Sequence, residues 1–157
     1  DFGLLAEVAR LRPDWQFVLI GETREGQEAV HTDALRALPN VHFLGHRPYA
    51  ELPDYLGGMA VGMLPTLLNP YTRSMFPMKF YEYLAAGVPV VSTALDFTRT
   101  PLPHLRIATD AASFCAAIEN QLRRGRLGIG EAELAVADNT WGSRMERMLA
   151  IAYAPAA

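Results

Sequence analysis

Short apolar runs alternate with segments of helical periodicity along this chain, and that alternation limits its fold more than any other feature. Runs of four to six residues with the composition of buried strands occupy residues 16–20, 41–44, 59–64, 88–92 and 105–108. Apolar spacing and capping residues predict helices at residues 2–11, 28–38, 49–56, 77–86, 111–124, 131–137 and 141–153. Strands that alternate with helices form a parallel sheet covered on both faces, so the sequence predicts a doubly wound α/β domain.

The composition excludes several classes of protein. The 157 residues are 50% hydrophobic and carry a formal net charge of −3, so no basic excess is available to bind nucleic acid. No apolar run approaches the roughly 20 residues that span a bilayer, and Cys115 cannot form a disulfide within the chain. We therefore expect one domain, residues 1–157, in the reducing cytoplasm. The sequence has no metal-ligand spacing, Walker loop or Ser-His-Asp arrangement, so neither a metal site nor hydrolase or ATPase chemistry is expected.

Candidate ligand-binding residues follow the predicted strands. In a doubly wound domain, ligands bind in the crevice at the carboxyl ends of the parallel strands. Glycines or polar residues stand at four such ends: Gly21-Glu22, Gly45-His46-Arg47, Pro65-Thr66 and Ser92-Thr93. These domains normally open on a strand at the centre of the sheet, whereas Asp1 leads straight into a helix. We expect that strand to lie ahead of Asp1. The two strands that would flank it in the sheet then have no partner between them.

The segment of residues 69–91 carries the groups best suited to a phosphorylated ligand. A loop enters a helix here, and backbone N–H groups at a helix N-terminus suit a phosphate. Arg73 before the helix and Lys79 in its first turn would add positive charge to a diphosphate site. Lys79 and Glu82 are three residues apart and share a helix face, where a carboxylate can accept hydrogen bonds from the two hydroxyls of a ribose.

The alternative for this segment is a solvated helix face with one weak salt bridge. The basic residues comprise thirteen arginines and one lysine, Lys79. An ammonium is more compact than a guanidinium, so a lysine at this one position is a modest indication that Lys79 binds a ligand rather than only facing solvent.

A known signature matches residues 77–91. This stretch, PMKFYEYLAAGVPVV, resembles the donor-binding pattern of GT-B glycosyltransferases, Pro-x-Lys-x-x-Glu-Tyr-Leu-Ala-x-Gly-x-Pro-Val-Val. The likeness is greatest to the family-four-type bacterial enzymes that build surface polysaccharides, and it extends to residues 12–21, 40–45 and 139–144. It implies that the chain is the C-terminal, nucleotide-sugar-binding half of a GT-B fold, with a Rossmann-like parallel sheet that lacks its first strand. The acceptor-binding domain would lie ahead of Asp1, and this half alone would be inactive.

The resemblance also implies donor-binding roles for ten residues, and it does not identify the catalytic residues. Glu82 would bind the ribose of a nucleoside diphosphate sugar, while Lys79 and Arg73 would lie near the diphosphate. The others would surround the donor: Ser74, Met75 and Phe76 near the phosphates or the sugar, Gly45, His46 and Arg47 near the base, and Gly21 in the strand-end crevice. Ser74 departs from the family, because many relatives carry at this position a glutamate that contacts the donor sugar. The departure leaves retention of the sugar's configuration open.

By this resemblance, the parent enzyme would transfer a sugar from a nucleoside diphosphate donor to a glycan or lipid-linked acceptor without a metal or other cofactor. Positive charge from Arg73, Lys79 and the helix start would stabilise the leaving diphosphate. The acceptor would bind through the missing domain, and the full-length enzyme could associate peripherally with a membrane. Two alternatives stay open. One is a nucleotide-sugar epimerase of GT-B-like fold, and the other is a non-catalytic nucleotide-binding or scaffold module, which Ser74 would suit.

Overall fold

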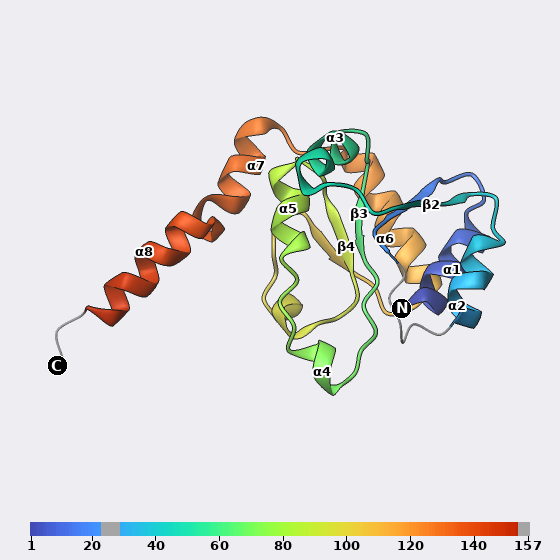
Figure 1. Cartoon of the computed structure of the whole chain (residues 1–157), viewed down its shortest axis with the longest axis horizontal. Helices are drawn as coiled ribbons and strands as arrows, with labels where there is room; N and C mark the ends of the chain where they lie inside the picture. The colour runs from blue at the N-terminus through green and yellow to red at the C-terminus, as the bar shows by residue number, and fades with distance from the viewer. Residues whose placement is uncertain (23–28, 154–157) are drawn as a thin grey trace.

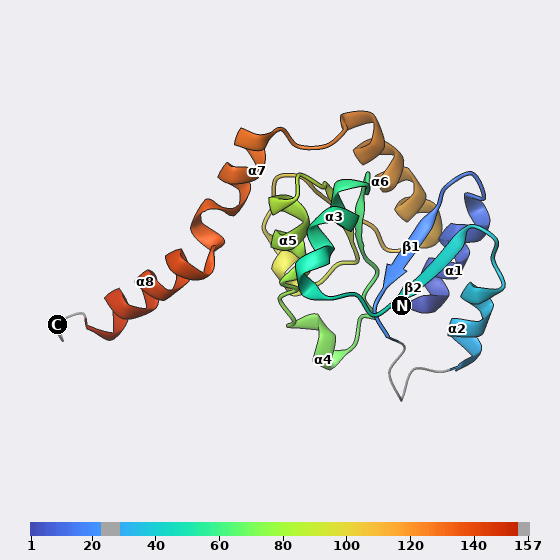
Figure 2. The same cartoon turned by 45° about the horizontal axis from the view of Figure 1, so that its top comes forward.

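The strands of the protein form two parallel sheets. The computed structural model describes residues 1–22 and 29–153, and within them the first sheet pairs β1 with β2 and the second has the order β3-β4-β5 (Figures 1 and 2). The strands are β1 (Phe17–Ile20), β2 (Val41–Gly45), β3 (Gly62–Leu64), β4 (Val90–Ser92) and β5 (Leu105–Ile107). Every pair is parallel, with Phe17 opposite Val41 in the first sheet and Gly62 opposite Val90 in the second. The predicted α/β class with parallel strands is confirmed.

No hydrogen-bonded pair joins β1 to β3 among the residues that the structure describes. The two sheets nevertheless share one apolar core, which contains Phe17 and Val41 from the first sheet and Val91 from the second. Helices α1 (Phe2–Leu11) and α6 (Ala111–Arg124) pack against each other over this core. Within the described residues, β1 and β3 therefore each have an edge without a strand partner, although a continuous core supports both sheets.

The remaining helices cover the sheets or lead away from them. They are α2 (Ala29–Arg36), α3 (Leu52–Gly57), α4 (Pro70–Arg73), α5 (Lys79–Ala85), α7 (Ile129–Val136) and α8 (Trp141–Ala152), with 3-10 turns at Tyr49–Glu51, Asp96–Arg99 and Ala137–Asn139. The helix predicted at 28–38 begins at residue 28, which lies outside the described residues. Helix α6 has the predicted bounds because Asp110 caps it, accepting a hydrogen bond from the Ser113 amide at 2.8 Å.

Several elements start later than the sequence predicts, each for a local reason. Helix α5 begins at Lys79 rather than at residue 77, with Met78 as its N-cap. Strand β4 begins at Val90 rather than at residue 88, because the Val88 amide donates to the Tyr83 carbonyl and closes α5. Strand β3 begins at Gly62 rather than at residue 59, because the Met59 amide is still bonded to the end of α3.

The loop that leads into α5 contains one short helix, α4. The Asn69 side chain accepts hydrogen bonds from the amides of Tyr71 and Thr72, both at 2.9 Å, and Pro70 occupies the first helical position. An asparagine N-cap followed by proline is a strong helix start, so the segment folds into a turn of helix although its apolar periodicity is weak.

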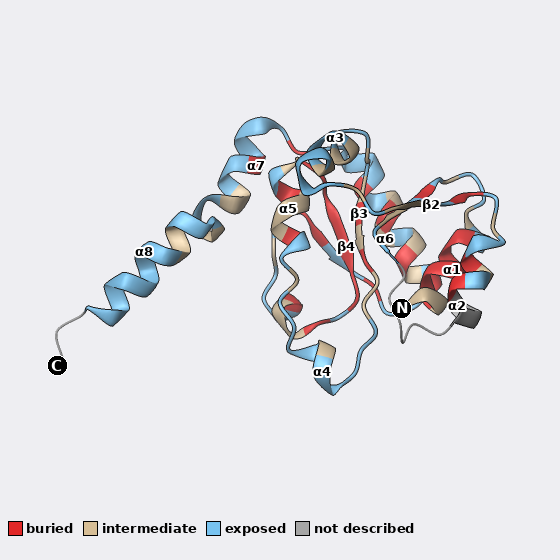
Figure 3. Cartoon of the chain, in the orientation of Figure 1, coloured by how far each residue is buried: buried red, intermediate tan, exposed pale blue. Residues whose placement is uncertain are grey.

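Helix α8 projects away from the rest of the molecule, as Figure 1 shows. None of its residues is buried, and Figure 3 shows it almost entirely as exposed or half-buried surface. Within the described part of the chain, no helix is both long and apolar enough to cross a membrane.

Candidate functional site

A cavity of about 580 Å³ lies between β1, α3 and α5. Val18 and Ile20 line it from β1, while Phe17 and Leu19 on the same strand belong to the core with α1. Because successive strand residues point to opposite faces, the cavity lies on the face of β1 turned away from that core, and it reaches the carboxyl end of the strand at Gly21. This is the strand-end crevice that the fold class predicts for a ligand.

Helix α5 forms one wall with a single stripe of its surface. Lys79, Glu82, Tyr83 and Ala86 all line the cavity. Their spacing of three, four and seven residues from Lys79 places them on one side of a helix. Phe80 and Leu84, which are only 1% and 2% exposed, anchor the helix in a second apolar cluster that lies against β3, β4 and β5. The polar stripe of α5 therefore faces the cavity.

No ion pair joins Lys79 to Glu82 within the described residues. Both residues line the same cavity, and Lys79 is exposed whereas Glu82 is half-buried. Because the two side chains are not paired with each other, each can bind a different group of one ligand. The ammonium suits an anion, and the carboxylate suits a diol.

Tyr83 is a site residue that the sequence analysis did not identify. Burial, and to a lesser extent the negative charge of Glu82, raise the pKa of Tyr83 above its usual value of 10.0. The hydroxyl therefore stays protonated and can donate as well as accept a hydrogen bond. Its ring packs so closely on Gly62 of β3 that a Cβ at position 62 would lie 2.6 Å from the ring Cδ2. A glycine in a short strand is the only sequence signal of this contact.

The opposite wall is apolar and comes from α3. Leu52, Pro53 and Leu56 line the cavity from this helix, which contributes no residue to the core. The sequence analysis missed this wall, because apolar residues in a short helical segment resemble core positions.

The loop after β2 closes one end of the cavity with His46 and Arg47. The Gly21 amide donates to the Gly45 carbonyl at 2.9 Å, and Gly45 adopts φ 70°, a conformation that favours glycine. The Arg47 Nε donates to the Tyr55 hydroxyl at 2.7 Å, which ties this loop to α3. Gly45 therefore shapes the turn that carries His46 and Arg47 into the cavity, without lining it.

The other two polar strand ends do not line the cavity. At the ends of β3 and β4, the Thr93 hydroxyl donates to the Thr66 carbonyl at 2.8 Å, and the Ser92 hydroxyl donates to the Thr93 carbonyl at 2.9 Å. The Thr93 bond joins the two strand ends to each other, whereas the Ser92 bond stays within the end of β4.

Five of the ten predicted site residues thus line one cavity, namely Gly21, His46, Arg47, Lys79 and Glu82. Arg73 and Ser74 lie at the end of α4, where Ser74 is its C-cap, and both are exposed. Met75 follows them, and the Phe76 ring packs against the rings of Tyr81 and Phe97, with 5.6 Å and 5.2 Å between ring centroids. The segment of residues 73–76 leads into the site helix but does not line this cavity.

No cluster of three or more metal-ligating side chains occurs in residues 1–22 and 29–153. Among the residues that the structure describes, Lys79 and Arg47 bring an ammonium and a guanidinium to the cavity. Any anionic ligand bound there would meet an ammonium and a guanidinium.

Comparison with known proteins is consistent with this geometry. The family described as "Glycosyl transferases group 1" matches residues 3–124. A protein of Bacillus subtilis (strain 168) named for teichuronic acid biosynthesis, the glycosyltransferase TuaH, is 38% identical over 98 residues, which are 62% of this chain and 24% of that protein. The crystal structure of WaaG, a glycosyltransferase involved in lipopolysaccharide biosynthesis, superposes with a TM-score of 0.62 at 16% identity, over 99% of this chain and 43% of WaaG. The chain therefore spans less than half the length of both similar proteins.

Proposed function

Because the chain belongs to the group 1 glycosyl transferases, we propose that its cavity binds the nucleoside diphosphate part of a sugar donor. The cavity of about 580 Å³ is in the range of about 300–1,000 Å³ that is usual for small-molecule sites. The observation that carries the proposal is the stripe of α5 on which Lys79 and Glu82 face the cavity together. In this proposal the protein transfers the sugar to a glycan or lipid-linked acceptor.

The chemistry of the walls suggests the orientation of the nucleotide. Glu82 accepts hydrogen bonds from the ribose hydroxyls, and the Lys79 ammonium, one turn away, stabilises the diphosphate. The base lies between the apolar wall of α3 and the loop that carries His46 and Arg47, where one face of the ring is dry and its edge meets polar groups. Arg73 and residues 74–76 remain predictions for the phosphate and sugar end of the donor.

Transfer requires a diphosphate to leave with the developing negative charge. In the proposed mechanism, fixed cationic side chains stabilise that charge in place of a metal ion, because a positive group already in position need not reorganise during the reaction. Lys79 is the group in the cavity that can serve this role. Transfer, rather than loss of the sugar to water, requires that the site be closed by the acceptor side of the enzyme.

Calorimetric titration with UDP, GDP and ADP tests the proposal. We expect one of them to bind to the unmodified protein, and Glu82→Gln to weaken that binding by about tenfold or more, the effect of one hydrogen bond to a charged group. The matched control is Glu133→Gln, which removes an exposed carboxylate from α7, outside this cavity.

A 2′-deoxy nucleotide makes the test specific for the ribose. Removing the 2′-hydroxyl should weaken binding to the unmodified protein but have little further effect in the E82Q variant, because the two changes delete the same contact. If none of the three nucleotides binds, or if E82Q binds as tightly as the unmodified protein, the proposal is wrong. Incubating the enzyme with donor alone separates transfer from epimerisation, because only an epimerase forms an isomerised sugar without an acceptor.

A further inference from the structure

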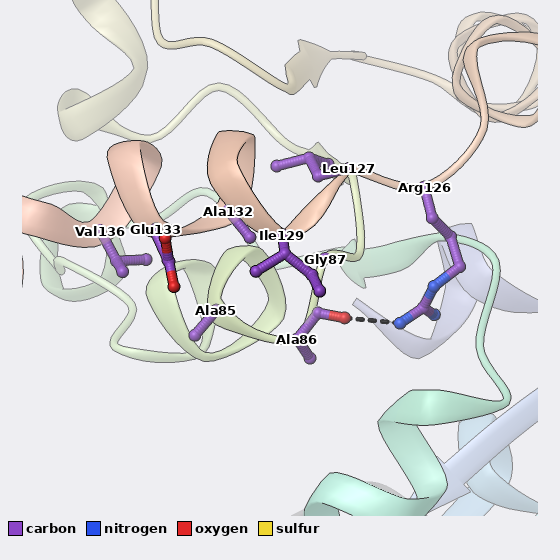
Figure 4. A pocket seen from close by; sticks show the side chains of 9 residues that line it. All are labelled: Ala85, Ala86, Gly87, Arg126, Leu127, Ile129, Ala132, Glu133 and Val136. Atoms are coloured by element: carbon purple, nitrogen blue, oxygen red, sulfur yellow. Dashed lines mark hydrogen bonds between the residues drawn. The ribbon is translucent and has the colours of Figure 1, made fainter.

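Arg126 does not line the cavity, but its side chain donates hydrogen bonds at the ends of α3 and α5, the two helices that form the cavity walls. It lies in the connection between α6 and α7, on the exposed surface. Its Nη1 donates to the carbonyls of Leu56, at 3.0 Å, and Met59, and its Nη2 donates to the Ala86 carbonyl at 2.5 Å. Figure 4 shows the guanidinium pointing toward Ala86 from beyond the C-terminal end of α5.

The three carbonyls lie at or just beyond the C-terminal ends of the wall helices. Leu56 belongs to the last turn of α3 and Met59 follows it, while Ala86 is the C-cap of α5. Carbonyls in the last turn of a helix lack the amide four residues further on that pairs with carbonyls in its interior. The Leu56 carbonyl does accept from the Met59 amide at 3.2 Å, so Arg126 adds a second donor there, and a carbonyl oxygen has two lone pairs to accept both. A guanidinium carries five N–H donors in a rigid plane and can hold two such ends at once, whereas a lysine ammonium presents a single point of charge.

Helix α3 depends on this connection more than α5 does. None of the α3 residues is buried, whereas α5 is anchored in the core by Phe80 and Leu84. The bond from Arg47 to Tyr55 joins α3 only to the loop that immediately precedes it in the chain. The bonds of Arg126 therefore connect α3, the apolar wall of the cavity, to α5, the wall that carries Lys79 and Glu82.

The backbone beside Arg126 is itself held firmly. The neighbouring Leu127 is buried in the core cluster that contains Phe80, and its amide donates to the Gly87 carbonyl at 2.9 Å. Gly87 has φ 73°, and a Cβ at that position would lie 3.0 Å from the Leu127 carbonyl oxygen. The backbone at Arg126 therefore cannot move easily relative to α5, and the bonds of its guanidinium hold the end of α3 at a fixed position relative to α5.

We propose that Arg126 is a positioning residue for the nucleotide, which sets the separation of the two walls of the cavity without lining it. The proposal rests on the function proposed above. The guanidinium keeps Leu52 and Leu56 of α3 at a fixed distance from Glu82 on α5, so that the base and the ribose of one nucleotide are bound at the same time. Without it, α3 can move away from α5 and the apolar wall no longer contacts a nucleotide held by Glu82.

Arg126→Met tests this, because methionine keeps an unbranched apolar side chain and loses every donor. The control is Arg123→Met, which removes an exposed arginine from the end of α6 whose partner Glu119, 4.0 Å away, lies on the same helix. The probe is whichever of UDP, GDP and ADP binds the unmodified protein, and its affinity is measured by calorimetry at a temperature at which circular dichroism shows each variant fully folded. We expect R126M to weaken binding of that nucleotide about tenfold, the equivalent of one hydrogen bond to a charged group, and R123M to leave it unchanged. Equal affinities of R126M and R123M in the folded state would overturn the proposal.

Hydrogen exchange distinguishes positioning from a general loss of stability. The amides of Gly58 and Met59, which bond to the carbonyls of Tyr55 and Leu56, report on the end of α3. R126M should speed their exchange while the amides of α6 keep wild-type rates, and a uniform increase across the protein would contradict a positioning role. This measurement needs no nucleotide, so failure of UDP, GDP and ADP alike to bind the unmodified protein would refute the proposed function while exchange still decides what Arg126 does.

Should R126M fail to fold, Arg126→Lys gives the same test. A single ammonium cannot hold the carbonyls of both helix ends in the way that a guanidinium does. We expect R126K to bind the same nucleotide more weakly than the unmodified protein does, and wild-type affinity in R126K would show that the wall separation does not depend on the guanidinium.

Discussion

The contact between Gly62 and Tyr83 gives the sharpest prediction about the site. In Gly62→Ala, the new Cβ would lie 2.6 Å from Cδ2, 2.7 Å from Cγ and 3.0 Å from Cε2 of the Tyr83 ring. Carbon atoms in contact normally lie about 3.5–4.0 Å apart, so the overlap is roughly 1 Å. The atoms involved are those nearest to the α5 backbone, and the ring cannot escape by a small rotation at its far end.

The cost of this overlap follows from how firmly α5 is held. Phe80 and Leu84 fix the helix in the core, so the ring or the strand must shift at a cost of about 1–3 kcal/mol, the usual range for overpacking. We expect G62A to lower the free energy of unfolding by that amount, measured by urea denaturation. The displaced ring lines the cavity, so nucleotide binding should weaken as well. Gly57→Ala is the control, because a Cβ at this helical glycine meets no atom within 4 Å, and it should leave stability unchanged or raise it by about 0.5–1 kcal/mol.

A double-mutant cycle attributes the cost to the ring. In a Tyr83→Ala background the clashing atoms are gone, and Gly62→Ala should then have little effect on the free energy of unfolding. The reasoning is refuted if G62A is as stable as the unmodified protein, or if it destabilises the Y83A variant by the same amount.

Three further predictions concern other parts of the structure. The Asn40 amide donates to the carbonyls of Ala9, Arg12 and Trp15 at 3.0–3.2 Å; Asn40→Ala leaves these acceptors without that donor and should lower the free energy of unfolding by about 1–3 kcal/mol, and an unchanged urea midpoint would contradict this. Burial lowers the pKa of His104 below 6.5, with a smaller effect of Arg124 and an opposing one of Glu131. Stability should therefore be complete above about pH 6.5 and fall as the pH drops from there through the folded-state pKa, because the unfolded state binds the proton more readily. His104→Asn, which tolerates the φ of 62° at this position, should flatten denaturant midpoints measured from pH 7.5 to 5.5, and an unaltered pH dependence would exclude His104 as the cause. The Arg144 guanidinium lies 5.5 Å from the ring centroids of both Phe76 and Tyr81; Arg144→Met should weaken the attachment of α8 by about 0.5–1 kcal/mol, seen as faster hydrogen exchange in α8 alone, and exchange that speeds up in α6 as well would point to another cause.

The chemistry of the site helix was accessible from sequence because it depends on local periodicity. Lys79 and Glu82 are three residues apart in a segment that could only be a helix between two turns, so both had to appear on one side of it. The parallel α/β class was predictable for the same reason. Strand and helix periods differ, and their alternation is visible without any knowledge of packing. The bounds of α6 followed from one residue, Asp110, whose side chain accepts bonds from its own neighbours.

The residues that shape the cavity were not accessible in this way, because each acts on a segment distant in the chain. Gly62 matters only because Tyr83 approaches it, Asn40 because three carbonyls from residues 9–15 converge on its amide, and Arg126 because the ends of α3 and α5 meet beside it. Residues 73–76, predicted to lie near the phosphates or the sugar of the donor, lie outside this cavity, at the end of α4 and beside Tyr81 and Phe97, where a local helix cap and an aromatic cluster hold them. Periodicity and capping act over three or four residues, so the sequence by itself determined the elements and the face that α5 presents. The separation of the walls depends on which segments approach one another, and only the tertiary structure decided that.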